Sequence, residues 1–277
     1  MSCAPKHLHY TIEGQGPVIV LSHALGCDAG MWNEVSALLC SHYTIVRYDH
    51  RGHGGSTGGN SPFTIRDLAD DAAALIQSLQ RGAVHFAGVS MGGMTAQALA
   101  AHYPELLLSV TIANAASHYD AASRAGWQER IHTVQQHGMH AIAEGALQRW
   151  FSPTFLQTQA ARIEQLRRTL LNTDPLAYSN ACSAVAGIEL TRSNPRIHCP
   201  ALVIAGRYDL ATPIAASETI AAAIPDARLV ILEAAHIGCV EQPVAFAQLL
   251  NEHIQQAKAR SSGPTISEPG CTLLVPR

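Results

Sequence analysis

Three residues of the types that cooperate in nucleophilic catalysis occur in the order Ser90, Asp209, His236 along this 277-residue chain. Ser90 is the centre of Gly-Val-Ser-Met-Gly, which follows an apolar stretch and precedes an Ala-rich one. A serine on a tight turn from strand to helix is forced into strained backbone angles, and its hydroxyl projects freely. The pattern predicts that Ser90 is a nucleophile, and the alternative is that it caps the helix.

A serine hydroxyl needs a base within hydrogen-bond reach, and the base needs a group that orients it. Asp209 follows the apolar run Ala201 to Ala205, and His236 follows the run Arg228 to Leu232. Parallel sheets place ligand sites just past the carboxyl ends of their strands. We therefore predict His236 as the base and Asp209 as the orienting acid, with Asp226 and Glu233 as alternative acids.

Acyl transfer passes through an oxyanion, which two backbone N–H groups stabilise by several kcal/mol. Met91, directly after the expected nucleophile, is the first candidate donor. The second is expected in Ser22-His23-Ala24-Leu25-Gly26, where Leu25 is the favoured position. His23 could be a second base, but on so tight a loop we favour a hydrogen bond from its ring to the backbone.

The elements that must position these residues alternate between short β-branched runs and Ala-rich amphipathic stretches, which is typical of a mostly parallel sheet. The first two strands flank the turn signal Gly14-Gln15-Gly16-Pro17, so we expect an antiparallel hairpin at the sheet edge. The expected strands are Leu8 to Glu13, Val18 to Ser22, Thr44 to Tyr48, Val84 to Gly88, Leu108 to Ala113, Ala201 to Ala205 and Arg228 to Leu232. The expected helices are Thr64 to Gln80, Gly92 to His102, Ile214 to Ile224 and Pro243 to Gln256.

The stretch 117–195 interrupts this alternation with helical periods and no convincing strand. We predict a helical cap there, with helices at Trp127 to His137, His140 to Trp150 and Gln157 to Asn172, inserted into a core of residues 1–116 and 196–257. Residues 258–277 read as a flexible tail. The tail ends in Leu-Val-Pro-Arg, which matches an engineered protease site, so we interpret it as a remnant of one.

Composition excludes several classes of protein. The chain is 47% hydrophobic and 14% charged with a net charge of −3, which argues against disorder and against nucleic acid or anionic lipid as partners. It has no long apolar window and no signal-peptide core, so we expect a cytoplasmic protein. Its seven scattered cysteines form no CxxC pair. We therefore expect no disulfide framework, no metal site and no cofactor.

The chain resembles the α/β-hydrolase family from Leu8 to about Ala257. Besides the serine turn, Asp49-His50-Arg51-Gly52-His53-Gly54-Gly55-Ser56 resembles the family's Asp-x-Arg-Gly-x-Gly-x-Ser loop, and the triad order is the family's order. Within the superfamily the chain is most similar to 3-oxoadipate enol-lactonases, through Gly30-Met31-Trp32, Val46-Arg47-Tyr48-Asp49, Gly88 to Met94, Arg149-Trp150-Phe151 and His236-Ile237 followed by Glu241-Gln242-Pro243.

The resemblance implies a cofactor-free hydrolase of a small ester or lactone in aromatic-compound catabolism, with a helical lid and with Trp150 lining the pocket. Known lactonases tend to carry an arginine shortly after a strand ending in Asn-Thr-Ala-Ala, where this chain has Ser117-His118. His118 is the candidate substrate-binding group in its place. An imidazole, mostly neutral at pH 7, does not replace a bidentate guanidinium, so a neutral ester or lactone stays a rival substrate.

Other reactions on the same triad stay open: thioester or C–C bond hydrolysis, peracid formation and lyase chemistry. A slow-turnover ligand receptor is a remote alternative. The sequence does not decide whether the chain forms a homo-oligomer.

Overall fold

The computed structural model describes residues 7–261. Within that range a seven-stranded sheet has the order β1-β3-β2-β4-β5-β6-β7, and each pair is parallel except β1 with β3. The strands are β1 (Tyr10–Gly14), β2 (Val18–Ser22), β3 (Thr44–Tyr48), β4 (Val84–Val89), β5 (Leu107–Ala113), β6 (Ala201–Gly206) and β7 (Arg228–Leu232). The predicted mostly parallel α/β architecture is confirmed.

The predicted hairpin between the first two strands is wrong. β1 pairs antiparallel with β3, with Tyr10 opposite Tyr48, because both edges of β2 are occupied by the parallel strands β3 and β4. The turn after β1 lies against the backbone of the segment before β3, and a Cβ on Gly14 would lie 2.3 Å from the Tyr43 carbonyl oxygen. The glycine turn therefore carries the chain across β3 instead of folding it back on itself.

The strand order reverses direction at β2. The chain runs from β2 to β3 on one side and then crosses to β4 on the other. In open α/β sheets the crevice at such a switch point is the usual place for a ligand. The loop after β2 and the turn after β4 meet there, which brings Leu25 and Ser90 to one end of the sheet.

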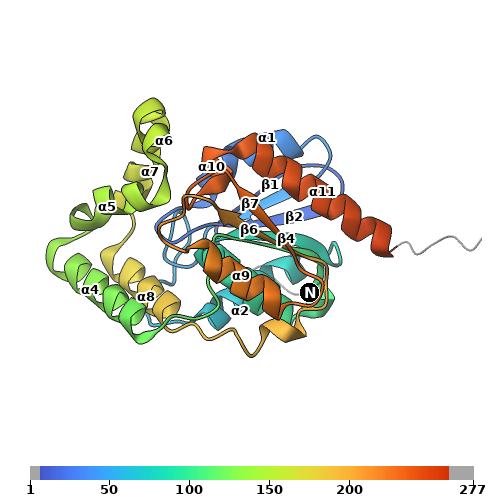
Figure 1. The fold of residues 1–277 in the computed structure, drawn as a ribbon, viewed down its shortest axis with the longest axis horizontal. Helices are drawn as coiled ribbons and strands as arrows, with labels where there is room; N and C mark the ends of the chain where they lie inside the picture. Colours follow the sequence, from blue (N-terminus) through green and yellow to red (C-terminus); the bar gives the residue numbers. More distant parts are fainter. Residues whose placement is uncertain (1–6, 262–277) are drawn as a thin grey trace, which may run out of the picture.

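Helices cover both faces of the sheet (Figure 1). One face holds α1 (Asn33–Leu39) and α11 (Pro243–Ser261), which pack on each other near the short α10 (Gly238–Glu241). The other holds α2 (Ile65–Leu79), α3 (Met91–His102) and α9 (Ile214–Ala223). Short 3₁₀ turns occupy Ala29–Trp32, Pro104–Leu106 and Asn194–Arg196. The sequence did not predict α1, which has only seven residues.

The insert between β5 and β6 is helical as predicted and lies to one side of the sheet (Figure 1). It contains α4 (Ala121–His137), α5 (His140–Trp150), α6 (Pro153–Thr158), α7 (Ala160–Leu171) and α8 (Pro175–Ala186). Helix α5 has the predicted bounds. Helix α4 begins earlier than predicted because the Asp120 carboxylate accepts the Ser123 N–H and caps it. The predicted helix at 157–172 is divided between α6 and α7, and α8 was missed.

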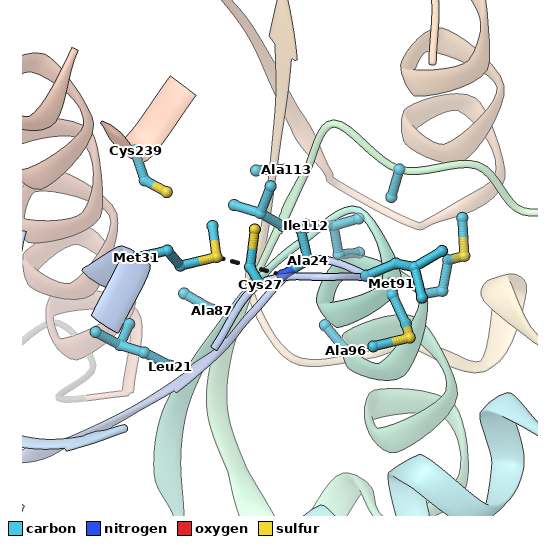
Figure 2. Packing of buried hydrophobic residues seen from close by; sticks show 14 of the residues in the cluster. Leu21, Ala24, Cys27, Met31, Ala87, Met91, Ala96, Ile112, Ala113 and Cys239 are labelled. Atoms are coloured by element: carbon cyan, nitrogen blue, oxygen red, sulfur yellow. Dashed lines mark hydrogen bonds between the residues drawn. The ribbon is translucent and has the colours of Figure 1, made fainter. Parts of the chain in front are cut away.

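The core beneath the site is built from small and sulfur-containing side chains. Figure 2 shows Met31 on one side of the loop that carries Ala24 and Cys27, and Met91 on the other side, at the start of α3. The Met31 sulfur accepts the Ala24 N–H at 3.3 Å, so even the apolar core anchors that loop. Close packing of this kind keeps a loop in one position.

The predicted tail begins too early, because α11 continues to Ser261. Residues 262–277, which hold the rest of that tail, lie outside the described residues. In the part of the chain that the structure describes, no helix is both long and apolar enough to cross a membrane.

Candidate active site

Ser90 lies on the sharp turn between β4 and α3. Its φ of 57° and ψ of −116° are strained for a residue with a side chain. The turn is held by the Ser90 N–H, which donates to the Ala113 carbonyl at 2.9 Å. The Ser90 side chain makes no capping hydrogen bond to α3, so the alternative in which it serves as a helix cap does not fit.

Glycines make this turn sterically feasible. A Cβ on Gly88 would lie 2.0 Å from the Gly92 carbonyl oxygen, and one on Gly92 would lie 2.2 Å from the Ser22 carbonyl oxygen. Real Cβ atoms do not approach backbone this closely, so only glycine fits at either position. The close contact at Gly92 also fixes the start of α3 against the loop after β2.

His236 and Asp209 are joined by a hydrogen bond of 2.8 Å from His236 Nδ1 to Asp209 Oδ2. Both side chains are buried. Asp209 also accepts from Asn114 Nδ2 at 2.9 Å and from the Thr212 hydroxyl at 2.7 Å, and its other oxygen accepts two backbone N–H groups. A carboxylate held this completely cannot rotate away from the imidazole, so it fixes the proton on Nδ1 and leaves Nε2 basic.

Electrostatics keep Asp209 ionised. Burial on its own would raise the pKa of Asp209, but the positive charge of His236 and the hydrogen bonds it accepts lower that pKa below its ordinary value. The alternative acids lie elsewhere. Glu233 is exposed and bonds to Arg207 and Tyr208, while Asp226 is exposed on a turn beyond α9. Neither contacts His236.

Two backbone N–H groups next to the serine are free to donate. Within residues 7–261 neither the Leu25 N–H nor the Met91 N–H bonds to another protein group. Met91 begins α3, so no residue of its own helix can accept from it. Both are in the sequence positions expected of oxyanion donors, one in each of the loops that meet at the switch point.

Ser90 and His236 line the same cavity of about 250 Å³. The cavity lies between the strand ends and the helical insert, and its other walls are Leu25, Tyr119, Ser123, Gly126, Trp127, Arg130, Ala146, Arg149, Trp150, Tyr178, Leu210, Ala211 and Thr212. Trp150 is 8% exposed and lies over the loop after β2, which contains Leu25 and is called the oxyanion loop below. A Cβ on Gly26 of this loop would be 3.5 Å from the Trp150 ring. Its carbonyl accepts the Ile237 N–H, so Trp150 also joins the insert to the histidine loop.

Glu241 forms a second connection between the insert and the histidine loop. Its carboxylate accepts the Ala235 N–H at 3.0 Å and also bonds to the Ser152 hydroxyl at the start of α6. The loop that carries His236 is therefore fixed to the insert from two directions.

Two arginines of the insert line the cavity without an anionic partner. Arg130 on α4 and Arg149 on α5 are half-buried, and neither forms an ion pair with a carboxylate among the described residues. Burial, and then the positive charge of Arg130, lowers the pKa of Arg149. The Arg130 guanidinium stacks over the Trp127 ring, 4.5 Å from its centroid. The cavity that Ser90 lines thus also carries positive charge.

The structure does not bring His118 into this cavity. Its side chain is exposed, and its backbone forms a bridge with Glu189 at the base of the insert. The substrate-binding role expected of His118 has no support in this geometry. Trp150, in contrast, lies where the resemblance placed it.

Sequence reasoning missed Arg130 and the role of Arg149. Arg149 precedes Trp150 directly in the stretch that carried the resemblance, and Arg130 lies one helical turn after Trp127. Their convergence depends on how α4 packs beside α5, which no local pattern shows. No group of three or more His, Cys, Asp or Glu side chains in the described part of the chain is arranged to hold a metal ion.

The fold and the site together define an α/β hydrolase. The family model for the alpha/beta hydrolase fold matches residues 17–243, and the chain belongs to this family. The chain is 37% identical to 3-oxoadipate enol-lactonase 2 of Acinetobacter baylyi over 241 residues, which is 86% of this chain and 90% of that protein. The enol-lactonase of Burkholderia xenovorans superposes with a TM-score of 0.86 at 36% identity, covering 90% of this chain and 96% of that one.

A third relative is the (E)-2-((N-methylformamido)methylene)succinate hydrolase of Acinetobacter baylyi. It is 30% identical over 203 residues, which is 73% of this chain and 76% of that protein. The predicted resemblance to enol-lactonases is confirmed, and the chain is an enzyme whose relatives hydrolyse ester bonds.

Proposed function

We propose that this enzyme hydrolyses a small lactone or ester that carries a carboxylate, through an acyl-enzyme on Ser90, with 3-oxoadipate enol-lactone as the substrate to test first. The observation that carries the choice of an anionic substrate is the pair of arginines, Arg130 and Arg149, that face the serine cavity without a carboxylate partner. No cofactor enters this chemistry.

In the proposed acylation each of the three polar side chains has one role. The Ser90 hydroxyl attacks the lactone carbonyl carbon as His236 Nε2 takes its proton, and Asp209 stabilises the imidazolium that forms. The N–H groups of Leu25 and Met91 donate to the oxyanion. Collapse of the intermediate breaks the ring C–O bond, and the leaving oxygen takes the proton from His236. With an enol-lactone this oxygen becomes an enol, which then converts to the ketone.

Deacylation repeats these steps with water as the nucleophile. His236 takes a proton from the water, which attacks the ester carbonyl, and then returns the proton to Ser90 as the acyl C–O bond breaks. The opened lactone stays attached to Ser90 until this step. The cavity is therefore useful in both halves of the reaction, because it retains the acyl chain beside the base.

The arginine pair selects the charge of the substrate. The positive charge of Arg130 adds to the burial that lowers the pKa of Arg149, so the two guanidinium groups repel each other, and a carboxylate between them relieves this repulsion. Guanidinium binds carboxylate in a planar, two-pronged geometry, which orients as well as attracts. These arginines come from helices of the insert. They do not occupy the position where known lactonases tend to carry an arginine, which is Ser117-His118 in this chain. They supply the charge that the exposed His118 does not.

The names of relatives agree with an anionic substrate. Two of them are named for 3-oxoadipate enol-lactone or for a substituted succinate, and both compounds carry carboxylates. The solved structure of an esterase from Thermogutta terrifontis, 27% identical to this chain, is described as malate bound. This similarity supports an acidic substrate for the present cavity as well.

The test compares 3-oxoadipate enol-lactone with its methyl ester, which is neutral, in the wild type and in Arg149→Met. We expect the KM for the anionic lactone to rise at least about tenfold in the variant, about 1.4 kcal/mol, while kcat/KM for the methyl ester stays within about threefold. Arg130→Met should behave in the same way.

Arg168→Met is the matched control, because Arg168 is an exposed arginine of α7 that pairs with Glu164. It should leave both substrates unaffected. If kcat/KM falls equally for the charged and the neutral substrate in Arg149→Met, the arginine supports the fold of the insert and does not select substrates by charge.

A further inference from the structure

The loop after β2 lies on three buried histidines that the proposed reaction does not use. The rings of His50 and His53 lie 4.7 and 5.2 Å from the ring of His23, measured between centroids. All three are at most 1% exposed. Burying three imidazoles is costly unless they remain neutral and make specific hydrogen bonds.

His23 has a fixed tautomer. Its Nε2 accepts the backbone N–H of His50 at 2.8 Å, so the ring proton must be on Nδ1. Nδ1 in turn donates to the Ala24 carbonyl oxygen at 2.8 Å. Burial lowers the pKa of His23 despite the nearby carboxylates of Asp49 and Asp28, so the ring stays neutral and keeps its acceptor.

The carbonyl that His23 holds belongs to the same peptide unit as the Leu25 N–H. A trans peptide is planar, and its C=O and N–H point in opposite directions. Fixing the Ala24 oxygen therefore fixes the direction of the Leu25 N–H. The Ala24 oxygen also accepts the Cys27 N–H at 3.1 Å, so the oxygen is held by two donors on the side away from the free N–H.

The peptides on either side are held as well. The Ala24 N–H donates to the Met31 sulfur (Figure 2), and the Gly26 N–H donates to His53 Nε2 at 3.2 Å. Of the N–H groups of Ala24, Leu25 and Gly26, only that of Leu25 is left without a protein acceptor. Leu25 itself lines the serine cavity.

We propose that His23 is a positioning residue that orients the Leu25 N–H as an oxyanion donor, by holding the Ala24 carbonyl through Nδ1 while the His50 backbone fixes its tautomer. His53 supports the same loop from the Gly26 side. This inference rests on the proposed function, because it gives a role to residues that never contact the substrate.

Two variants separate the hydrogen bonds of His23. His23→Asn keeps a donor at the δ position and loses the acceptor for the His50 N–H, while His23→Gln keeps an acceptor at the ε position and loses the donor to Ala24. We expect kcat on p-nitrophenyl acetate to fall at least about tenfold in His23→Gln with KM within about twofold. Loss of an entire oxyanion donor costs roughly a hundredfold or more in kcat. His23→Asn should stay within about threefold of wild type.

Phenylboronic acid supplies a second readout, since its tetrahedral adduct with a serine resembles the transition state. Its inhibition constant should rise in His23→Gln by the factor that kcat falls. His253→Leu, which removes a buried histidine from α11, is the control and should leave kcat unchanged. Thermal unfolding of each variant checks that the folded fraction is the same.

The inference is overturned if His23→Gln keeps full kcat, or if His23→Asn loses as much as His23→Gln. If the wild type is not acylated by p-nitrophenyl acetate and hydrolyses no lactone, the proposed function fails and the inference fails with it. An active wild type with unaffected variants rejects only the role of His23.

Discussion

Asp209 Oδ2 lies 2.8 Å from His236 Nδ1, and the same oxygen accepts hydrogen bonds from Asn114 and Thr212. The aspartate therefore orients the imidazole and is itself oriented by the residues that follow β5 and β6. Because three side chains converge on one carboxylate oxygen, its role can be tested by changing that oxygen alone.

Asp209→Asn replaces the acceptor with an amide that can present N–H to Nδ1 and so favours the wrong imidazole tautomer. We expect kcat to fall by about four orders of magnitude, with thermal stability within a few degrees of wild type. Steady-state kinetics on p-nitrophenyl acetate measure the loss. A nearly silent substitution would show that another acid orients His236, and Glu233 would be the next residue to change.

Gly92→Ala tests the steric account of the serine turn. The new Cβ would lie 2.2 Å from the Ser22 carbonyl oxygen, so α3 and the oxyanion loop must move apart. We expect a loss of at least about 2 kcal/mol in the free energy of unfolding, measured by urea titration. Gly126→Ala on α4 is the matched control, because nothing lies within 4 Å of its Cβ, and it should be neutral or stabilising. Equal stability of the two variants would contradict the close contact.

The buried histidines predict a loss of stability in mild acid. Burial lowers the pKa of His53 to about 3 and the pKa of both His85 and His253 to about 4. Between pH 6.5 and these values the unfolded chain binds protons that the folded chain does not, so stability falls as the pH falls. For each histidine that stays neutral in the folded state, the free energy of unfolding is about 2 kcal/mol lower at pH 5 than at pH 7.

Urea titrations at pH 7 and pH 5 measure this loss. Carboxylates with a lowered pKa, such as Asp209, lose their contribution to stability only at lower pH. They therefore do not contribute to the change in stability between pH 7 and pH 5. In His253→Leu, the number of protons taken up on unfolding near pH 5 should be smaller by about one. A free energy of unfolding that is the same at pH 7 and pH 5 would contradict the account.

Much of the fold could be predicted because its signals are local. The β-branched runs, the glycines around Ser90 and the Ala-rich helices each follow from short-range patterns, and the positions of Asp209 and His236 follow from strand ends. The edge pairing of β1 could not be predicted, since a glycine turn looks the same whether the chain folds back or crosses a neighbouring strand. The convergence of Arg130 with Arg149 is also non-local, because it depends on how the helices of the insert pack.

In the loop after β2, the sequence predicted one hydrogen bond of His23 but not the other. The sequence indicated a backbone hydrogen bond from His23, and the structure contains one to Ala24. What the sequence could not show is the acceptor role of Nε2 toward His50, which fixes the tautomer. That contact joins residues from the ends of two different strands, β2 and β3.

The most direct measurement is the hydrolysis of 3-oxoadipate enol-lactone by the wild type and by Ser90→Ala, with p-nitrophenyl acetate assayed in parallel. We predict a kcat/KM for the lactone of about 10⁴ M⁻¹s⁻¹ or more in the wild type. In Ser90→Ala we predict the loss of both activities with unchanged thermal unfolding. Lactone hydrolysis that survives in Ser90→Ala would contradict the proposed acyl-enzyme on Ser90. Ester hydrolysis without lactone turnover in the wild type would contradict the proposed substrate.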